Sequence, residues 1–197
     1  MKRASVETSD HEKAPEEGGD NKRAKISTDR LLYKTGSALT IPSSSDQTTV
    51  VMHVCNDVGK WGRGFVLAVS RVSSAPENAY RQWFRTKKSE NGTTFKLGAV
   101  QFVRVNERMV VANMIGQRDI VRRDGLPPHR IEAVRKAVRT VLSRASDEGW
   151  NVQCPRIGCS LGGGSWAVVS KMLQEELERV PSVHITVCTR PEDSYRP

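Results

Sequence analysis

The sequence predicts an α/β fold of three layers, in which a mixed, mainly parallel sheet lies between helices. Short runs of β-branched and apolar residues alternate along the chain with segments whose apolar residues recur at the helical period. Residues 48–55 are almost continuously apolar, which is typical of a strand covered on both faces. Two glycine-rich segments, 56–64 and 158–164, each stand between a predicted strand and a predicted helix. In such sheets, ligands bind at these junctions.

The individual elements follow from local pattern. Strands are expected at residues 31–33, 48–55, 100–105, 109–115, 152–157 and 183–188. The third and fourth of these flank a short polar turn and predict a β-hairpin. Helices are expected to begin at Phe65, Pro76, Pro127 and Trp166, and the third should end at Gly149.

The chain is predicted to hold one domain and two tails. Residues 1–30 carry seven basic and seven acidic residues and very few large apolar ones, so we expect a disordered, charge-balanced tail. Residues 31–190 form the predicted domain, and 191–197 a C-terminal tail. The whole net charge of +9 therefore belongs to residues 31–197. A basic domain favours anionic partners, although charge alone does not separate nucleic acid, anionic lipid and a phosphate-bearing ligand.

Composition also limits where the protein acts. No stretch is long and apolar enough for a membrane span or a secretory signal, so a membrane role is not expected. Four cysteines without metal-ligand spacing fit reduced thiols, and no metal or cofactor is expected. The basic run at residues 22–25 resembles a nuclear localisation signal. We therefore expect a monomer in the nucleus or cytoplasm.

The two glycine-rich segments are suited to holding a diphosphate. Glycine allows the backbone to approach a ligand closely, and a helix N-terminus presents free N–H groups to an anion. Glycines that only make tight turns are the competing interpretation. Neither segment contains the Walker sequence, and Gly62-Arg-Gly64 lacks the third glycine of the dinucleotide fingerprint. Residues 158–162 match a nucleophile elbow around Ser160, with His184 downstream, but an α/β-hydrolase is usually longer than this chain.

At these segments the sequence resembles the macro domain family, which binds ADP-ribose. The resemblance covers residues 31–189 and rests on residues 33–38, 53–65 and 154–166. It is strongest for a divergent branch that includes the terminal ADP-ribose protein glycohydrolase, a yeast ADP-ribose 1''-phosphate phosphatase and the macro module of a poly-ADP-ribose-activated chromatin remodeller. The resemblance implies a site made of Asn56, Asp57, Gly59, Trp61, Gly62, Arg63, Gly64, Phe65, Gly116, Gln117, Gly158, Cys159, Ser160, Leu161, Gly162 and Gly163.

Three departures from the family pattern bear on activity. Ser37 stands where the family often has an acidic residue that binds adenine. Gly116 or Gln117 stands where the terminal glycohydrolase has its lysine, and Gly162 stands where it has its aspartate. The lysine-dependent mechanism of that enzyme therefore lacks both groups here.

Several single residues allow two interpretations each. Asp57 is the candidate acid–base group, or it caps the following turn. Trp61 stacks on the ligand or covers the base of its loop. Arg63 pairs with phosphate or stays solvated, and His53 is favoured as a core residue. A reactive thiol at Cys159 would need a basic partner, and none is evident.

Three functions remain open at this stage. The first is a module that binds free or protein-linked ADP-ribose without cleaving it. The second is a hydrolase of ADP-ribosylated proteins or of ADP-ribose 1''-phosphate that uses Asp57 and water. The third is a nucleic-acid-binding module, which is disfavoured because basic and aromatic residues are not interleaved. The basic residues Arg135, Lys136, Arg139 and Arg144 form a solvated helix face or a docking patch for nucleic acid or poly-ADP-ribose.

Overall fold

A computed structural model describes residues 29–42, 46–123, 125–159 and 162–189. The tail at residues 1–28, which includes the basic run, and the predicted C-terminal tail lie outside the described residues. Ser160 and Leu161, two of the expected ligand-loop residues, also lie outside them.

Six strands form one sheet. They are β1 (Leu31–Thr35), β2 (Thr49–Asn56), β3 (Val100–Asn106), β4 (Met109–Gln117), β5 (Asn151–Cys154) and β6 (Ile185–Thr189). Their order across the sheet is β1-β6-β5-β2-β4-β3. All neighbours are parallel except the hairpin of β3 and β4. The expected mixed, mainly parallel sheet is therefore confirmed.

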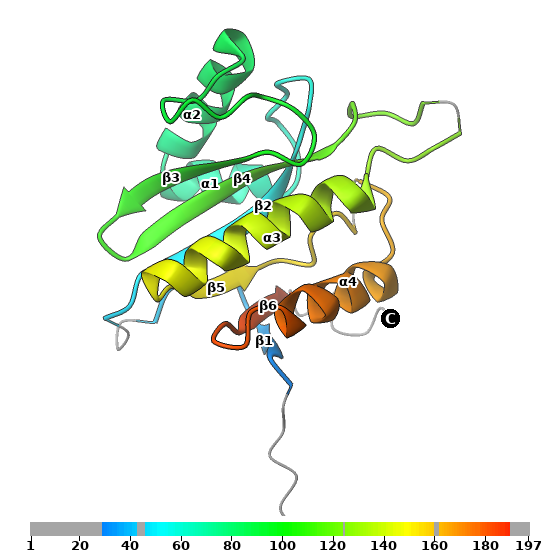
Figure 1. The fold of residues 1–197 in the computed structure, drawn as a ribbon. Helices are drawn as coiled ribbons and strands as arrows, with labels where there is room; N and C mark the ends of the chain where they lie inside the picture. Colours follow the sequence, from blue (N-terminus) through cyan, green and yellow to red (C-terminus); the bar gives the residue numbers. More distant parts are fainter. Residues whose placement is uncertain (1–28, 43–45, 124, 160–161, 190–197) are drawn as a thin grey trace, which may run out of the picture.

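Helices cover both faces of this sheet (Figure 1). They are α1 (Phe65–Val72), α2 (Ala75–Thr86), α3 (Ile131–Glu148) and α4 (Trp166–Glu178). One apolar core joins α3 and α4 to one face of the sheet, and a second joins α1 and α2 to the other. The central strands are buried because each contributes alternate residues to the two cores, as Val50 and Val51 do. This explains why residues 48–55 show no polar alternation.

Some predicted boundaries were wrong. The strand expected at residues 152–157 ends at Cys154, and the one expected at 183–188 begins at Ile185. Pro127 and Pro128 were expected to open the third helix, but α3 begins at Ile131. The residues before it are extended, because the N–H of His129 donates to Gly162 O and that of Arg130 donates to Gly116 O. Two prolines favour such an extended segment as readily as a helix start, since each restricts the residue before it. Gly149 ends α3 in the left-handed conformation, as expected.

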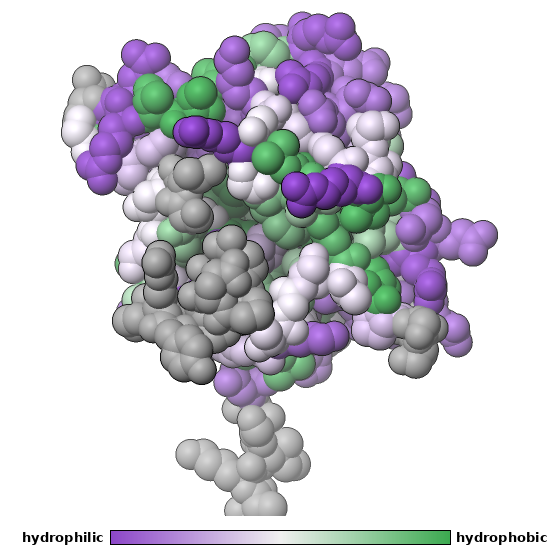
Figure 2. All heavy atoms as spheres, turned by 180° about the vertical axis from the view of Figure 1, so that it is seen from behind, coloured by the Kyte–Doolittle hydropathy of each residue, from purple (hydrophilic) through white to green (hydrophobic). Residues whose placement is uncertain are grey.

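Exposed apolar side chains lie on one face of the molecule. Figure 2 views the side that lies behind the sheet in Figure 1, where α1 lies, and shows hydrophobic patches among hydrophilic side chains. Leu67 and Val72 of α1 contribute exposed apolar side chains. Among the described residues, none of the helices is long and apolar enough to cross a membrane.

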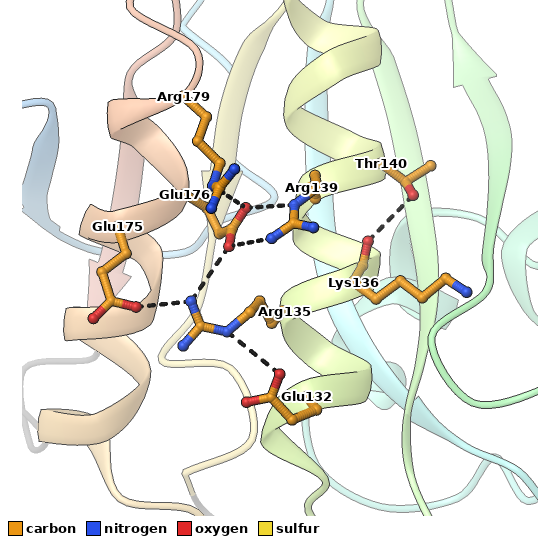
Figure 3. Close-up of polar contacts among 8 residues, drawn as sticks. All are labelled: Glu132, Arg135, Lys136, Arg139, Thr140, Glu175, Glu176 and Arg179. Atoms are coloured by element: carbon orange, nitrogen blue, oxygen red, sulfur yellow. Dashed lines mark hydrogen bonds and ion pairs between the residues drawn. The ribbon is translucent and has the colours of Figure 1, made fainter.

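An ion-pair network joins α3 to α4 (Figure 3). Glu176 is only 1% exposed, and its carboxylate accepts two hydrogen bonds from Arg139, each of 2.8 Å. Arg135 reaches both Glu175 and Glu176, at 2.7 and 3.3 Å. Hydrogen bonds from Arg139 and Arg135 hold the pKa of Glu176 below its usual range, although burial acts in the opposite direction. Two of the four basic residues of α3 are therefore structural.

We expect Glu176→Gln to lower the free energy of unfolding by about 1 kcal/mol, because both arginines lose a charged acceptor in a partly solvated cluster. Glu175→Gln is the matched control: the Glu175 side chain is 41% exposed, and Arg135 is its one ion-pair partner among the described residues, so this substitution should cost less than half as much. Urea denaturation of the variants measures both. Equal stability of the Glu176 variant and the parent protein would show that the network contributes nothing net.

Candidate functional site

The candidate site lies at the carboxyl ends of the central strands. Loop one (residues 56–64) leads from β2 into α1, and loop two (residues 158–165) leads from the β5 side of the sheet into α4. The pairing of β2 with β4 runs to Asn56 and Gln117, whereas the pairing of β2 with β5 ends at Val51 and Gln153. The backbones that enter the two loops are therefore not paired with each other at this end, which is the edge where ligands bind in sheets of this kind.

A third segment ties the two loops together. The bridging segment (residues 117–130) follows β4, and Gln117 O accepts a hydrogen bond of 2.9 Å from Asp57 N of loop one. The side chain of Asp57 forms a second bond to this segment: its Oδ1 accepts a hydrogen bond of 2.7 Å from Asp119 N. At its other end, His129 N donates to Gly162 O of loop two at 3.0 Å. The site residues expected from the sequence include Gly116 and Gln117 in this region, but they do not include Asp119 or His129.

Asn56 shapes loop one from within. Its Oδ1 accepts from Val58 N and Lys60 N at 3.1 and 3.0 Å, and its Nδ2 donates to Lys60 O. The hydroxyl of Tyr80 donates to the carbonyl oxygen of Asn56 at 2.6 Å. The polar atoms of Asn56 are thus engaged in fixing the turn, while Gly59 at the centre of this turn has a positive φ of 69° and lies against Phe84.

Trp61 occupies the base of loop one rather than its surface. The side chain is 6% exposed, its Nε1 donates to Ser70 Oγ at 2.8 Å, and its ring packs on His53 and Tyr80. The sequence left two roles open for Trp61, and this position corresponds to covering the base of the loop rather than to stacking on a ligand. Phe65, at the start of α1, is half-buried and packs on the same histidine.

His53 is a core residue. Its Nε2 donates to Asn113 Oδ1 at 2.7 Å, while the Nδ2 of Asn113 donates to Pro76 O. Burial lowers the pKa of His53 to about 4, although the bond to Asn113 opposes this shift. The imidazole is therefore neutral at physiological pH, with its proton committed to Asn113.

The helices that follow the two loops begin without anionic groups of their own. Neither α1 nor α4 has a side-chain cap or an acidic residue in its first turn, whereas α2 has Glu77 and α3 has Glu132 there. Gly62, Arg63 and Gly64 are exposed, and within the described part of the chain no protein acceptor pairs with their N–H groups. Free N–H groups at a helix N-terminus attract an anion. The site is thus prepared for negative charge at two helix ends.

His129 supports loop two from below. A Cβ at Gly158 would lie 2.2 Å from His129 Nδ1, and one at Gly164 would lie 3.1 Å from the same ring, so the glycines rest directly on the imidazole. His129 is 9% exposed, and burial lowers its pKa, with Arg130 acting in the same direction. A neutral ring can pack against backbone in this way without the cost of a buried charge.

Cys159 is an unreactive thiol in this setting. Its Sγ donates to Ile157 O at 3.2 Å, and burial raises the pKa of the thiol to about 11, against the opposing influence of Arg156. No group of three or more metal-binding side chains occurs among the residues that the structure describes.

Comparison with known proteins identifies the family. No protein-family model matches the sequence. A macrodomain protein from Streptomyces coelicolor is 40% identical, with a TM-score of 0.67, and the match covers 80% of this chain and 97% of that one. The chain belongs to the macrodomain family. A Bacteroides thetaiotaomicron protein of unknown function is 43% identical, with a TM-score of 0.73 and coverage of 81% of this macrodomain and 97% of that chain.

Curated relatives are more distant. ADP-ribose 1''-phosphate phosphatase of Chaetomium globosum is 28% identical over 158 residues, which cover 76% of this macrodomain and 83% of the phosphatase. Mouse chromodomain-helicase-DNA-binding protein 1-like is 25% identical over 175 residues, covering 82% of this chain but 18% of the mouse protein. Thermosipho africanus DarTG, solved in complex with ADP-ribose, shares the fold at 16% identity, with a TM-score of 0.59 and coverage of 75% of this chain and 39% of that one.

The contact between loop two and His129 predicts an unequal response of two glycines. Gly158 and Gly125 have nearly the same positive φ, 72° and 74°, but a Cβ at Gly125 would meet nothing within 4 Å. We expect Gly125→Ala to cost about 1 kcal/mol of stability through backbone strain alone. Gly158→Ala should cost at least twice as much, because His129 must also move. Urea denaturation compares them; equal losses would mean that loop two does not rest on the histidine.

Proposed function

We propose that this macrodomain binds ADP-ribose, free or linked to a protein, between loop one and loop two. The observation that carries the proposal is that the two helices beyond the glycine loops, α1 and α4, begin without an acidic residue in the first turn, unlike α2 and α3. A diphosphate supplies the anionic charge that neither helix provides for itself. The family and the phosphatase among the curated relatives support ADP-ribose as the source of that diphosphate.

Each loop has a distinct role in this proposal. Gly62, Arg63 and Gly64 offer backbone N–H groups, and Arg63 an exposed guanidinium, to the diphosphate and distal ribose. Residues 158–163 of loop two cover the phosphates, and the ring of His129 supports this loop. Ser37 follows β1 and offers a hydroxyl, whose oxygen accepts from Leu39 N at 3.2 Å, where the family often has a carboxylate. Adenine is then recognised without a charged acceptor at this position.

The packing around two glycines favours binding over cleavage by a lysine nucleophile. A Cβ at Gly116 would lie 2.5 Å from a methyl group of Val134, and one at Gly162 would lie 2.5 Å from Gln117 Nε2. Neither position has space for a side chain without repacking. Gly162 stands at the aspartate position, and neither Gly116 nor Gln117, the two candidate positions for the lysine, carries an amine. Lys60 is exposed and is the lysine of loop one.

Hydrolysis by activated water is the second candidate, and the similarity to a phosphatase favours it. It would depend on Asp57, whose Oδ1 already accepts the N–H of Asp119. One carboxylate oxygen thus holds the bridging segment, and the other would have to orient the water. Because the Asp57 carboxylate would have to hold the bridging segment and orient a water molecule at the same time, binding without turnover is the better-supported function.

Gly62 allows a test of the phosphate site without backbone strain. It has no positive φ, and a Cβ there would meet nothing within 4 Å, in contrast to Gly64 and Gly163, whose φ values are 77° and 70°. We expect Gly62→Glu to weaken ADP-ribose binding at least about tenfold relative to Gly62→Gln, because only the charge differs between them. Isothermal titration calorimetry measures both. Equal affinities would place the diphosphate elsewhere.

Asp57 separates the two candidate functions. Asp57→Asn keeps an oxygen for Asp119 N, so we expect an ADP-ribose affinity within about threefold of the parent, whereas Asp57→Ala should lose about tenfold. With ADP-ribose 1''-phosphate as substrate, we expect no phosphate release from the parent protein. Release that Asp57→Asn abolishes would instead establish a hydrolase that uses Asp57 to activate water.

A further inference from the structure

A cavity lined by basic residues lies away from the glycine loops. A cavity of about 1000 Å³ is bounded by α2, by residues 88–99, by β3 and by α3. No residue of loop one, loop two or the bridging segment lines it. Lys88 and Thr94 form an isolated antiparallel bridge in one wall, and the far wall consists of Lys136, Thr140 and Arg144 of α3. We call this feature the β3 groove.

The floor of the β3 groove is the edge of the sheet. β3 is the last strand in the sheet order and pairs with β4 alone. Five consecutive residues, from Val100 to Arg104, line the groove. A strand that faced a cavity with one surface would contribute alternate residues, so this run shows that the backbone edge itself borders the groove. An edge strand carries N–H and C=O groups without a strand partner, which another extended chain can pair with.

The charges around the groove are mainly positive. A single acidic residue, Glu90, lines it, against five basic ones: Lys88, Lys96, Arg104, Lys136 and Arg144. Within the described part of the chain, no acidic side chain pairs with Lys88, Lys96 or Lys136. The stem of Lys136 lies against Gly98, where a Cβ would be 3.0 Å from its Cδ. Figure 3 shows Lys136 directed away from the Glu176 network.

From this edge and these charges we propose that the β3 groove binds an extended acidic segment of a partner protein, which adds to the sheet beside β3. Backbone pairing with the strand edge supplies affinity, and carboxylates of the segment meet the lysines on the groove walls. The β3 groove is separate from the proposed ADP-ribose site, because the two have no lining residue in common.

Two other roles for the β3 groove, protection of the edge strand against aggregation and binding of a nucleic acid strand, explain fewer of these observations. Lysines on an edge strand discourage aggregation, but four of the five basic residues come from α3 and from the segment before β3, not from the edge strand itself. A nucleic acid strand would need aromatic faces for its bases. Trp83 is fully buried with its Nε1 bonded to Thr93 O, and the ring of Phe102 is covered by the guanidinium of Arg144 at 4.9 Å.

The test uses the full chain and a fluorescent peptide of about eight residues that alternates glutamate with valine, long enough to run along β3. We expect saturable binding by fluorescence anisotropy and protection of β3 amides from hydrogen exchange. Lys96→Glu combined with Lys136→Glu should weaken binding at least tenfold, whereas Lys171→Glu, an exposed change on α4, should leave it unaltered. ADP-ribose affinity should stay the same in all three proteins, so failure here is separable from failure of the ADP-ribose proposal.

Two further probes examine the mode of binding. Successive N–H groups of a strand point to opposite edges, so two peptides are compared, one methylated at its valine amides and one at its glutamate amides, with the charge unchanged. One of the two should bind at least tenfold more weakly than the parent peptide, and undiminished binding of both would overturn strand addition and leave charge attraction alone. No binding of the acidic peptide, or tighter binding of an oligothymidylate of equal charge that the double charge reversal abolishes, would overturn the proposal of a protein partner.

Discussion

The bridging segment is the constraint on which the candidate site depends. It leaves β4 and pairs with loop one through Asp57 and with loop two through His129, so it fixes two loops whose own strands have stopped pairing. Two of these bonds use backbone groups of the loops, Asp57 N and Gly162 O, and the side chain of Asp57 adds a third. A site built mainly from glycine backbone therefore acquires its geometry from outside the glycine segments.

The fold was predictable because it depends on local patterns. Continuous apolar character marked β2 as a strand covered on both faces, and the 3.6-residue period marked α3. The start of α3 was not predictable in this way, since Pro127 and Pro128 satisfy both a helix start and an extended segment. The choice is made by Gly116 and Gly162, whose carbonyl groups accept the N–H groups of the residues before α3.

The site was predictable only in part, for a related reason. Glycine-rich loops at strand ends can be read from sequence, because their position relative to strand and helix is local. The role of His129 cannot, because the ring acts by supporting Gly158 and Gly164, which lie far along the chain. Nor does the sequence reveal that Trp61 turns inward, since this depends on Ser70, His53 and Tyr80 gathering around one indole. Contacts of this kind follow only from the assembled sheet.

Charge on α3 shows how one helix serves two different ends. Arg135 and Arg139 point to α4 and pair with Glu175 and Glu176, whereas Lys136, the residue after Arg135, lines the β3 groove. The basic residues of α3 are therefore divided between an ion-pair network and a groove where no acidic side chain among the described residues pairs with Lys136. Such a field raises the rate at which anions reach the surface, but it does not select among them. Selection has to come from geometry: helix N-termini and close backbone at the glycine loops, and an open strand edge at β3.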